Sequence, residues 1–121
     1  MEKLCLLRDI HRTIRDFELD FQKRYGLCLN EGMALCSLKS GKLSASDIAA
    51  QLGISHSNAS KVIKSVEDKG LITRSLGEED KRHMYFVLSE EGESKLEEIK
   101  GEEPFVSPVL QQIQEMIQPT K

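Results

Sequence analysis

Residues 43–92 read LSASDIAAQLGISHSNASKVIKSVEDKGLITRSLGEEDKRHMYFVLSEEG, and this stretch decides the fold. Ser44 and Asp47 have the spacing of a helix capping box, and Gly53 supplies the turn residue that ends the short helix they begin. Ser55 then predicts the cap of a second short helix. Because two short helices joined by a tight glycine turn are typical of a helix-turn-helix, the spacing predicts that motif.

The second helix of this motif has two chemically different faces. Its inward face is apolar and consists of Ala59, Val62, Ile63 and Val66. Its outward face is expected to contact DNA through Ser57, Asn58, Ser60, Lys61 and Lys64. Small polar side chains can reach base edges in the major groove, and lysines can bind phosphate or guanine. The pattern therefore predicts a DNA recognition helix.

The alternating pattern after the second helix predicts a β-hairpin. Its strands are expected over 71–76 and 82–88, on either side of a short charged tip. A hairpin in this position is the wing of a winged helix. Its Lys81 and Arg82 can approach the minor groove of DNA, where the negative potential favours a guanidinium. Ser89 is expected to begin a further helix.

Two long apolar stripes flank the winged helix. The first ends at Gly26 and consists of Leu4, Leu7, Ile10, Ile14, Phe17, Phe21 and Tyr25. The second follows Pro104 and consists of Phe105, Val106, Val109, Leu110, Ile113, Met116 and Ile117. One small domain has too little surface to cover both stripes, so helices of a second copy are the expected cover. The alternative is that the first helix packs on its own chain.

These patterns together predict one mainly α-helical domain with a small β-hairpin. The winged helix-turn-helix is expected over 30–101, with Asn30 as the cap of its first helix. Dimerisation helices are expected over 1–26 and 104–119. A chain of 121 residues is suited to a single domain.

The distribution of charge agrees with DNA binding better than the net charge of −3 does. DNA binding depends on Lys and Arg side chains that neutralise phosphates. Residues 55–76 hold four basic against two acidic residues, whereas residues 89–103 hold seven glutamates against two lysines. The acidity therefore lies outside the predicted recognition helix.

The remaining residue types exclude several classes of function. Cys5, Cys28 and Cys36 form no CxxC pair, which favours a reducing compartment, and the last two are expected in the core. Early charges and the lack of a long apolar run indicate a cytoplasmic protein without a signal peptide or membrane partner. The three histidines lie too far apart to predict a metal site. No nucleophile has a suitably placed base, so we expect neither enzyme activity nor a cofactor.

Residues 43–92 closely resemble the winged helix of the MarR family of bacterial regulators. The most specific segments are VEDKGLITR at 66–74, DKR at 80–82 and LSEEG at 88–92. The resemblance implies a homodimeric regulator that binds double-stranded DNA at a pseudo-palindromic operator and acts mostly as a repressor.

The same resemblance implies roles for single residues. Arg82 would enter the minor groove, and Asp80 would help to hold the wing. Glu67 and Arg74 look like the structural pair that supports the wing from behind. The chain departs from the family in having a shorter C-terminal region and a wing that is acidic at its tip.

Two alternatives and one open question accompany this interpretation. A winged helix can serve as a protein-interaction module, although the exposed lysines favour DNA. Peroxide-sensing members of the family use an N-terminal reactive cysteine, so Cys5 on the first helix makes a thiol-based redox regulator the second alternative. The sequence marks no pocket for a small-molecule effector, so whether one exists stays open.

Overall fold

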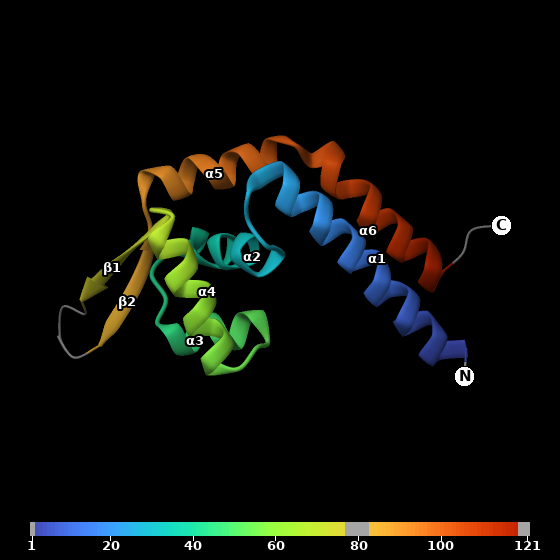
Figure 1. Cartoon of the computed structure of the whole chain (residues 1–121), viewed down its shortest axis with the longest axis horizontal. Coiled ribbons are helices and arrows are strands. Elements are labelled where there is room, and N and C mark those ends of the chain that lie inside the picture. Colours follow the sequence, from blue (N-terminus) through green and yellow to red (C-terminus); the bar gives the residue numbers. More distant parts are fainter. Residues whose placement is uncertain (1, 77–82, 119–121) are drawn as a thin grey trace. The chain divides into compact units, whose positions relative to one another are not determined.

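The computed structural model describes residues 2–76 and 83–118, apart from the side chains of Glu2 and Glu103 (Figure 1). Within these residues the chain is mainly α-helical and has one antiparallel sheet of two strands, which confirms the predicted fold class. The chain forms two compact units. Residues 29–98 make up one, and the described parts of 1–28 and 99–121 make up the other.

The terminal unit contains two helices that run side by side in opposite directions, α1 (Glu2–Tyr25) and α6 (Glu103–Ile117) (Figure 1). Aromatic rings join them at one end of the pair. The ring centroid of Phe105 lies 5.2 Å from that of Phe17 and 6.0 Å from that of Tyr25. The predicted N-terminal helix therefore packs partly on its own chain.

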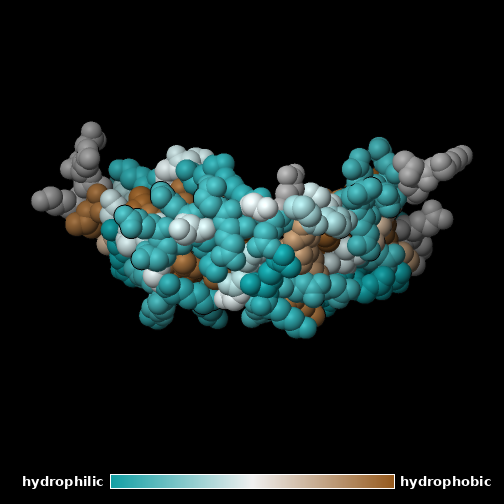
Figure 2. All heavy atoms as spheres, turned by 90° about the horizontal axis from the view of Figure 1, so that it is seen from above, coloured by the Kyte–Doolittle hydropathy of each residue, from teal (hydrophilic) through white to brown (hydrophobic). Residues whose placement is uncertain are grey.

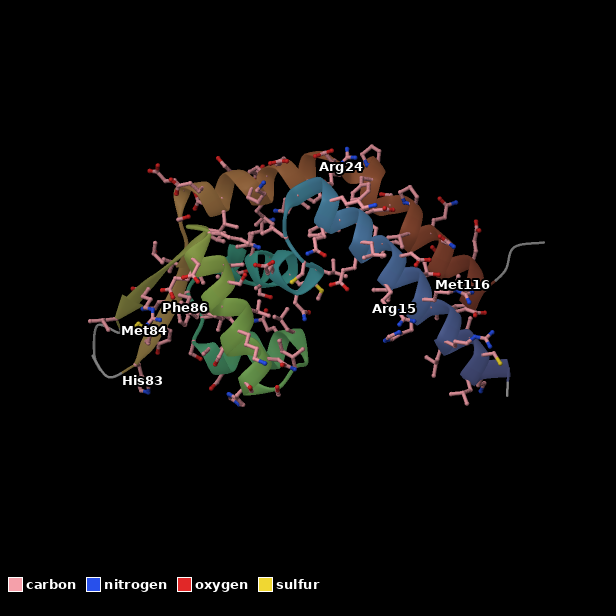
Figure 3. All side chains as sticks on the ribbon, viewed as in Figure 1. Arg15, Arg24, His83, Met84, Phe86 and Met116 are labelled. Carbon is pink, nitrogen blue, oxygen red and sulfur yellow. The ribbon has the colours of Figure 1, made fainter. Side chains whose placement is uncertain are left out.

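Charged and backbone contacts secure the same end of the helix pair. Arg24, labelled in Figure 3, donates from Nε to Oε2 of Glu102 over 2.7 Å, and its guanidinium carbon lies 4.6 Å from the centroid of the Phe105 ring. Gly26 has a φ of 70° and ends α1 as predicted. Pro104 lies in the first turn of α6, where a backbone N–H has no helical acceptor, so the helix begins one residue before it.

The other unit begins with three α-helices and a short 3₁₀-helix. These are α2 (Leu29–Ser37), η1 (Leu38–Ser40), α3 (Ala45–Leu52) and α4 (His56–Asp68). Because the helical backbone of α2 already includes Leu29, Asn30 lies inside its first turn, and the prediction that Asn30 precedes and caps this helix is wrong. The two helices of the predicted helix-turn-helix are α3 and α4.

The predicted capping signals of these two helices are confirmed. Ser44 Oγ accepts a hydrogen bond from the Asp47 N–H over 3.1 Å, and the Asp47 carboxylate accepts one from the Ser44 N–H over 3.1 Å. Gly53 ends α3 with a φ of 67°, in the left-handed region that favours glycine. Ser55 Oγ accepts from the Asn58 N–H over 3.1 Å at the start of α4. These local bonds determine where each helix begins and ends.

The wing consists of β1 (Ile72–Leu76) and β2 (Met84–Leu88), and α5 (Glu90–Gly101) follows it. The strands pair antiparallel. Leu43 adds one further antiparallel bridge to β2, through backbone hydrogen bonds of 3.2 and 2.8 Å with Phe86, which Figure 3 labels. This bridge ties the start of the helix-turn-helix to the wing.

The core of the winged helix lies where α2, α3 and α4 meet. Leu35, Ile48 and Val66 come from α2, α3 and α4 in turn, and each has a side chain with no solvent exposure. Phe86 covers this core from the wing with 5% exposure. Burial of these apolar side chains stabilises the packing of α4 on its neighbours.

The surface of the chain is mostly polar on the face drawn in Figure 2, where hydrophilic residues surround smaller hydrophobic patches. Among the residues that the structure describes, no helix is both long enough and apolar enough to cross a membrane.

Candidate nucleic-acid interface

The outward face of α4 is polar and exposed. The five residues predicted to contact DNA from this helix are all exposed: Ser57, Asn58, Ser60, Lys61 and Lys64. The opposite face is buried through Ala59, Ile63 and Val66. Because the faces follow the helical period, the same packing that buries one face presents the other to solvent.

One acidic residue shares this outward face. Asp68 lies one turn after Lys64, and its carboxylate is 3.7 Å from the Lys64 ammonium. Both side chains are well exposed, so this ion pair contributes little to the free energy of folding. Its effect is electrostatic, because it places a negative charge beside a lysine that is predicted to meet phosphate.

Glu67 and Arg74 form the ion pair that the sequence resemblance implied. Arg74 donates from Nε over 2.7 Å and from Nη2 over 3.2 Å to the two carboxylate oxygens of Glu67. This hydrogen bonding lowers the pKa of Glu67 below its ordinary value and raises that of Arg74. The Arg74 guanidinium carbon also lies 5.9 Å from the centroid of the Phe86 ring. The pair therefore links α4 to both strands of the wing.

A second carboxylate, which no local sequence pattern indicates, holds α4 from the side of α2. Glu31 is 4% exposed. It accepts a hydrogen bond from Ser65 Oγ over 2.7 Å and bonds from the Lys69 ammonium over 2.9 and 2.8 Å at its two oxygens. Two acids, one on α2 and one on α4 itself, thus fix α4 to its surroundings.

A basic residue beside β2 was not predicted from the sequence either. The Lys42 ammonium lies 4.9 Å from the centroid of the Tyr85 ring. Lys42 is exposed and directly precedes Leu43, whose bridge to Phe86 joins the wing. Nothing in the local sequence marks this position, because the contact depends on the pairing of distant segments.

The tip of the wing lies outside the described residues. The predicted contacts of Lys81 and Arg82 with DNA, and the predicted support by Asp80, therefore stay predictions. The strands that lead to the tip are described from Ile72 to Leu76 and from Met84 to Leu88.

The LSEEG segment joins the end of α4 to the start of α5. Ser89 Oγ accepts from the Gly92 N–H over 3.0 Å and donates to the Gly70 carbonyl over 2.6 Å. The Ser89 N–H donates to the Leu71 carbonyl over 3.0 Å. One serine therefore caps α5 and holds the turn between α4 and β1.

The three cysteines differ in burial. Cys5 and Cys28 are half-buried, whereas Cys36 is exposed, so the predicted core position of Cys36 is wrong. Cys36 shares its side of α2 with Met33, which is 40% exposed, while Ala34 and Leu35 point inward. The described residues contain no group of histidine, cysteine and carboxylate side chains that could hold a metal ion. Redox sensing by Cys5 stays an untested alternative.

The region that contains α2, α3 and α4 matches a known protein family. Residues 29–84 match the MarR family. The HTH-type transcriptional regulator Hpr of Exiguobacterium sibiricum is 36% identical over 90 residues, which are 74% of this chain and 43% of that protein. The chain thus spans less than half the length of this curated relative.

Solved structures share the fold. The YusO protein of Bacillus subtilis is 28% identical, with a TM-score of 0.68 over 93% of this chain and 82% of that one. MepR of S. aureus, solved as a complex with DNA, is 21% identical, with a TM-score of 0.74 over 88% of this chain and 81% of that one.

Proposed function

Because the chain belongs to the MarR family, we propose that it is a transcription regulator that binds double-stranded DNA in a sequence-specific manner. The observation that carries this proposal is the outward face of α4. It combines small polar side chains with Lys61 and Lys64, and all of them are exposed. A helix that docks on another protein requires exposed large apolar side chains, and among the described residues α4 has none.

The proposal assigns the contacts by chemistry. Ser57 and Asn58 lie in the first turn of α4, where a recognition helix contacts base edges. Lys61 and Lys64 follow one and two turns later and would neutralise phosphates. Lys81 and Arg82 of the wing would contact the adjacent minor groove. Glu67, Arg74 and Asp80 would support the wing without touching DNA.

The proposed active form is a homodimer. The terminal unit leaves large apolar side chains uncovered: Leu4 is 64% exposed, Leu7 62%, Leu110 61% and Ile117 56%. Surfaces of this kind are normally buried at an interface. Two-fold symmetry would place two recognition helices about 34–36 Å apart, one turn of DNA, which suits a pseudo-palindromic operator. Occupation of promoter DNA would then repress transcription.

Selection from a random duplex library, followed by fluorescence anisotropy on the selected duplex, tests this function. We expect the wild-type protein to enrich one pseudo-palindromic sequence and the double variant Lys61→Ala/Lys64→Ala to lose most of its affinity. Lys95→Ala controls for the loss of a lysine elsewhere on the chain, because it removes one from α5 and should leave binding unchanged. A wild-type protein that enriches no sequence would refute the proposal and favour the protein-interaction module.

A further inference from the structure

Glu31 is a buried charge that is held by directional hydrogen bonds. Its side chain is 5% exposed, and it accepts hydrogen bonds from Ser65 and Lys69. Moving a carboxylate out of water is unfavourable, and a well-packed apolar residue of similar volume often serves stability equally well. Stability alone therefore gives little reason for an acid at this point of the core. The directional bonds that the acid makes are what an apolar residue could not replace.

The partners of Glu31 lie on one flank of the recognition helix. With about 100° between successive residues, Ser57, Lys61 and Lys64 define the middle of the outward face of α4. Ser65 and Lys69 then lie about 80–120° to one side of that line, and Glu67 lies about 80° to the other side. The hydrogen bonds to Glu31 hold the first flank, and the Glu67–Arg74 pair holds the second.

This arrangement restrains the rotation of α4 about its own axis. The buried apolar face of α4 is held by interactions that are not directional, so burial alone tolerates a small rotation. A rotation of about 20° moves the ends of side chains at a radius of 5–6 Å by about 2 Å. That displacement exceeds what a hydrogen bond to a base edge tolerates. The hydrogen bonds of Ser65 and Lys69 to Glu31 on one flank, and the Glu67–Arg74 pair on the other, oppose such a rotation.

We propose that Glu31 is a positioning residue for DNA recognition, which sets the rotation of α4 and so aims Ser57 and Asn58 at the base edges. The inference rests on the proposed function. DNA binding combines contacts with base edges and contacts with phosphates, and a rotation of α4 should affect the two differently. Phosphate binding by flexible lysines tolerates a rotated helix, whereas hydrogen bonding to base edges does not. Loss of Glu31 should therefore lower sequence-specific affinity and spare non-specific affinity.

The test compares the affinity of Glu31→Gln for the selected duplex with its affinity for a scrambled duplex. Gln keeps the size of the side chain and removes the charge that binds Lys69. We expect specific affinity to fall about tenfold, the range of one misplaced hydrogen bond to a base, with non-specific affinity unchanged. Glu98→Gln is the matched control, because it makes the same change in charge at an exposed carboxylate that pairs with Lys95 on α5. It should leave the ratio of the two affinities at the wild-type value.

A second variant separates positioning from stability. Glu31→Met/Lys69→Met replaces the buried pair with apolar side chains and should unfold at a denaturant concentration no lower than wild type. We expect its ratio of specific to non-specific affinity to stay low. If the Lys69 ammonium also binds phosphate, its removal should weaken both affinities alike and leave this ratio unaffected. A wild-type ratio in either variant would overturn the positioning role while leaving the proposed function intact. A wild-type protein without sequence preference would overturn both.

Discussion

The α carbon of Gly92 lies against the backbone carbonyl of Leu71, so that a β carbon at position 92 would overlap the Leu71 carbonyl oxygen. It would also come within 3.3 Å of a methyl carbon of Leu88. Since Leu71 follows the end of α4 and Gly92 lies in the first turn of α5, the close approach joins α4 to the helix that follows the wing. The glycine of the LSEEG segment is thus required by space rather than by a left-handed φ.

Gly92→Ala should therefore destabilise the protein. The added methyl group has to displace backbone, so we expect a loss of about 1–3 kcal/mol in the free energy of unfolding. Gly101→Ala is the control within the same helix, because nothing lies within 4 Å of the added carbon. It should be neutral or stabilising by up to about 1 kcal/mol. Urea unfolding followed by circular dichroism measures both, and equal stabilities would show that the close approach is absent.

Ser89→Ala should also weaken the connection between α4 and α5, in this case through the loss of hydrogen bonds. The variant loses the hydroxyl that accepts from the Gly92 N–H and donates to the Gly70 carbonyl. Loss of a helix cap of this kind costs about 0.5–2 kcal/mol. Ser94→Ala, at an exposed position of α5, should change the midpoint of thermal unfolding little. A Ser89→Ala midpoint as high as that of the control would contradict the assigned role.

Local signals predict most of the winged helix because capping boxes and glycine turns act over only a few residues. Ser44, Asp47, Gly53 and Ser55 are all where their sequence pattern indicates. The bridge between Leu43 and Phe86 of β2 could not be predicted, because a single pair of residues 43 positions apart leaves no periodic pattern in the sequence. The alternation of apolar and polar residues in the hairpin predicted its two strands, but it did not predict that Leu43 pairs with the second of them.

In the candidate site, too, local patterns predict some residues, whereas contacts between distant segments could not be predicted. An amphipathic helix indicates which side chains face outward, so the exposed face of α4 could be predicted. Glu31 could not, because it resembles an ordinary surface acid until Ser65 and Lys69, 34 and 38 residues later, are folded against it. Cys36 was expected in the core from its residue type alone, and a short helix with one solvated side overrides that tendency.

The ion pair between Glu67 and Arg74 makes wing support depend on pH. The hydrogen bond from Arg74 lowers the pKa of Glu67 from the ordinary value of 4.5. A depressed pKa contributes stability that is present above the unfolded value and is lost as the pH falls through the folded value. We expect carbon-13 NMR to show Glu67 titrating below its ordinary value in the wild type and returning toward it in Arg74→Met. The same pKa in both proteins would contradict the pairing in solution.

Lys64 and Asp68 should have opposite effects on DNA binding. If Lys64 neutralises one phosphate, Lys64→Ala should weaken binding to every duplex and make the slope of log affinity against log salt shallower by about one unit. Asp68→Asn removes the negative charge 3.7 Å from the Lys64 ammonium and should strengthen binding to scrambled DNA. Anisotropy titrations over a series of salt concentrations measure both effects. Affinities that neither substitution changes would remove this part of α4 from the interface.

The protein should dimerise through its terminal helices, and its specific DNA binding should depend on the dimer. Ile14 lies on the α1 stripe with 40% exposure, and Leu7 lies two turns earlier on the same side with 62%. Burying a side chain such as Leu or Ile contributes about 1.5–3 kcal/mol, so several of them per copy can outweigh the entropic cost of association. Ile14→Asp places a charge in the middle of this surface and should split the dimer.

Lys23→Gln is the control for Ile14→Asp, because it makes the same change in net charge at an exposed position about 180° around the α1 axis from Ile14. Sedimentation velocity at micromolar concentration should show a dimer for the wild type and Lys23→Gln, and a monomer for Ile14→Asp. Affinity for the selected palindrome should fall sharply only in the monomer, because the winged helix of one protomer makes half of the contacts. Non-specific binding by each winged helix should persist. A monomeric wild-type protein that binds the palindrome tightly would refute this architecture, since each α4 would then read its half-site without a partner.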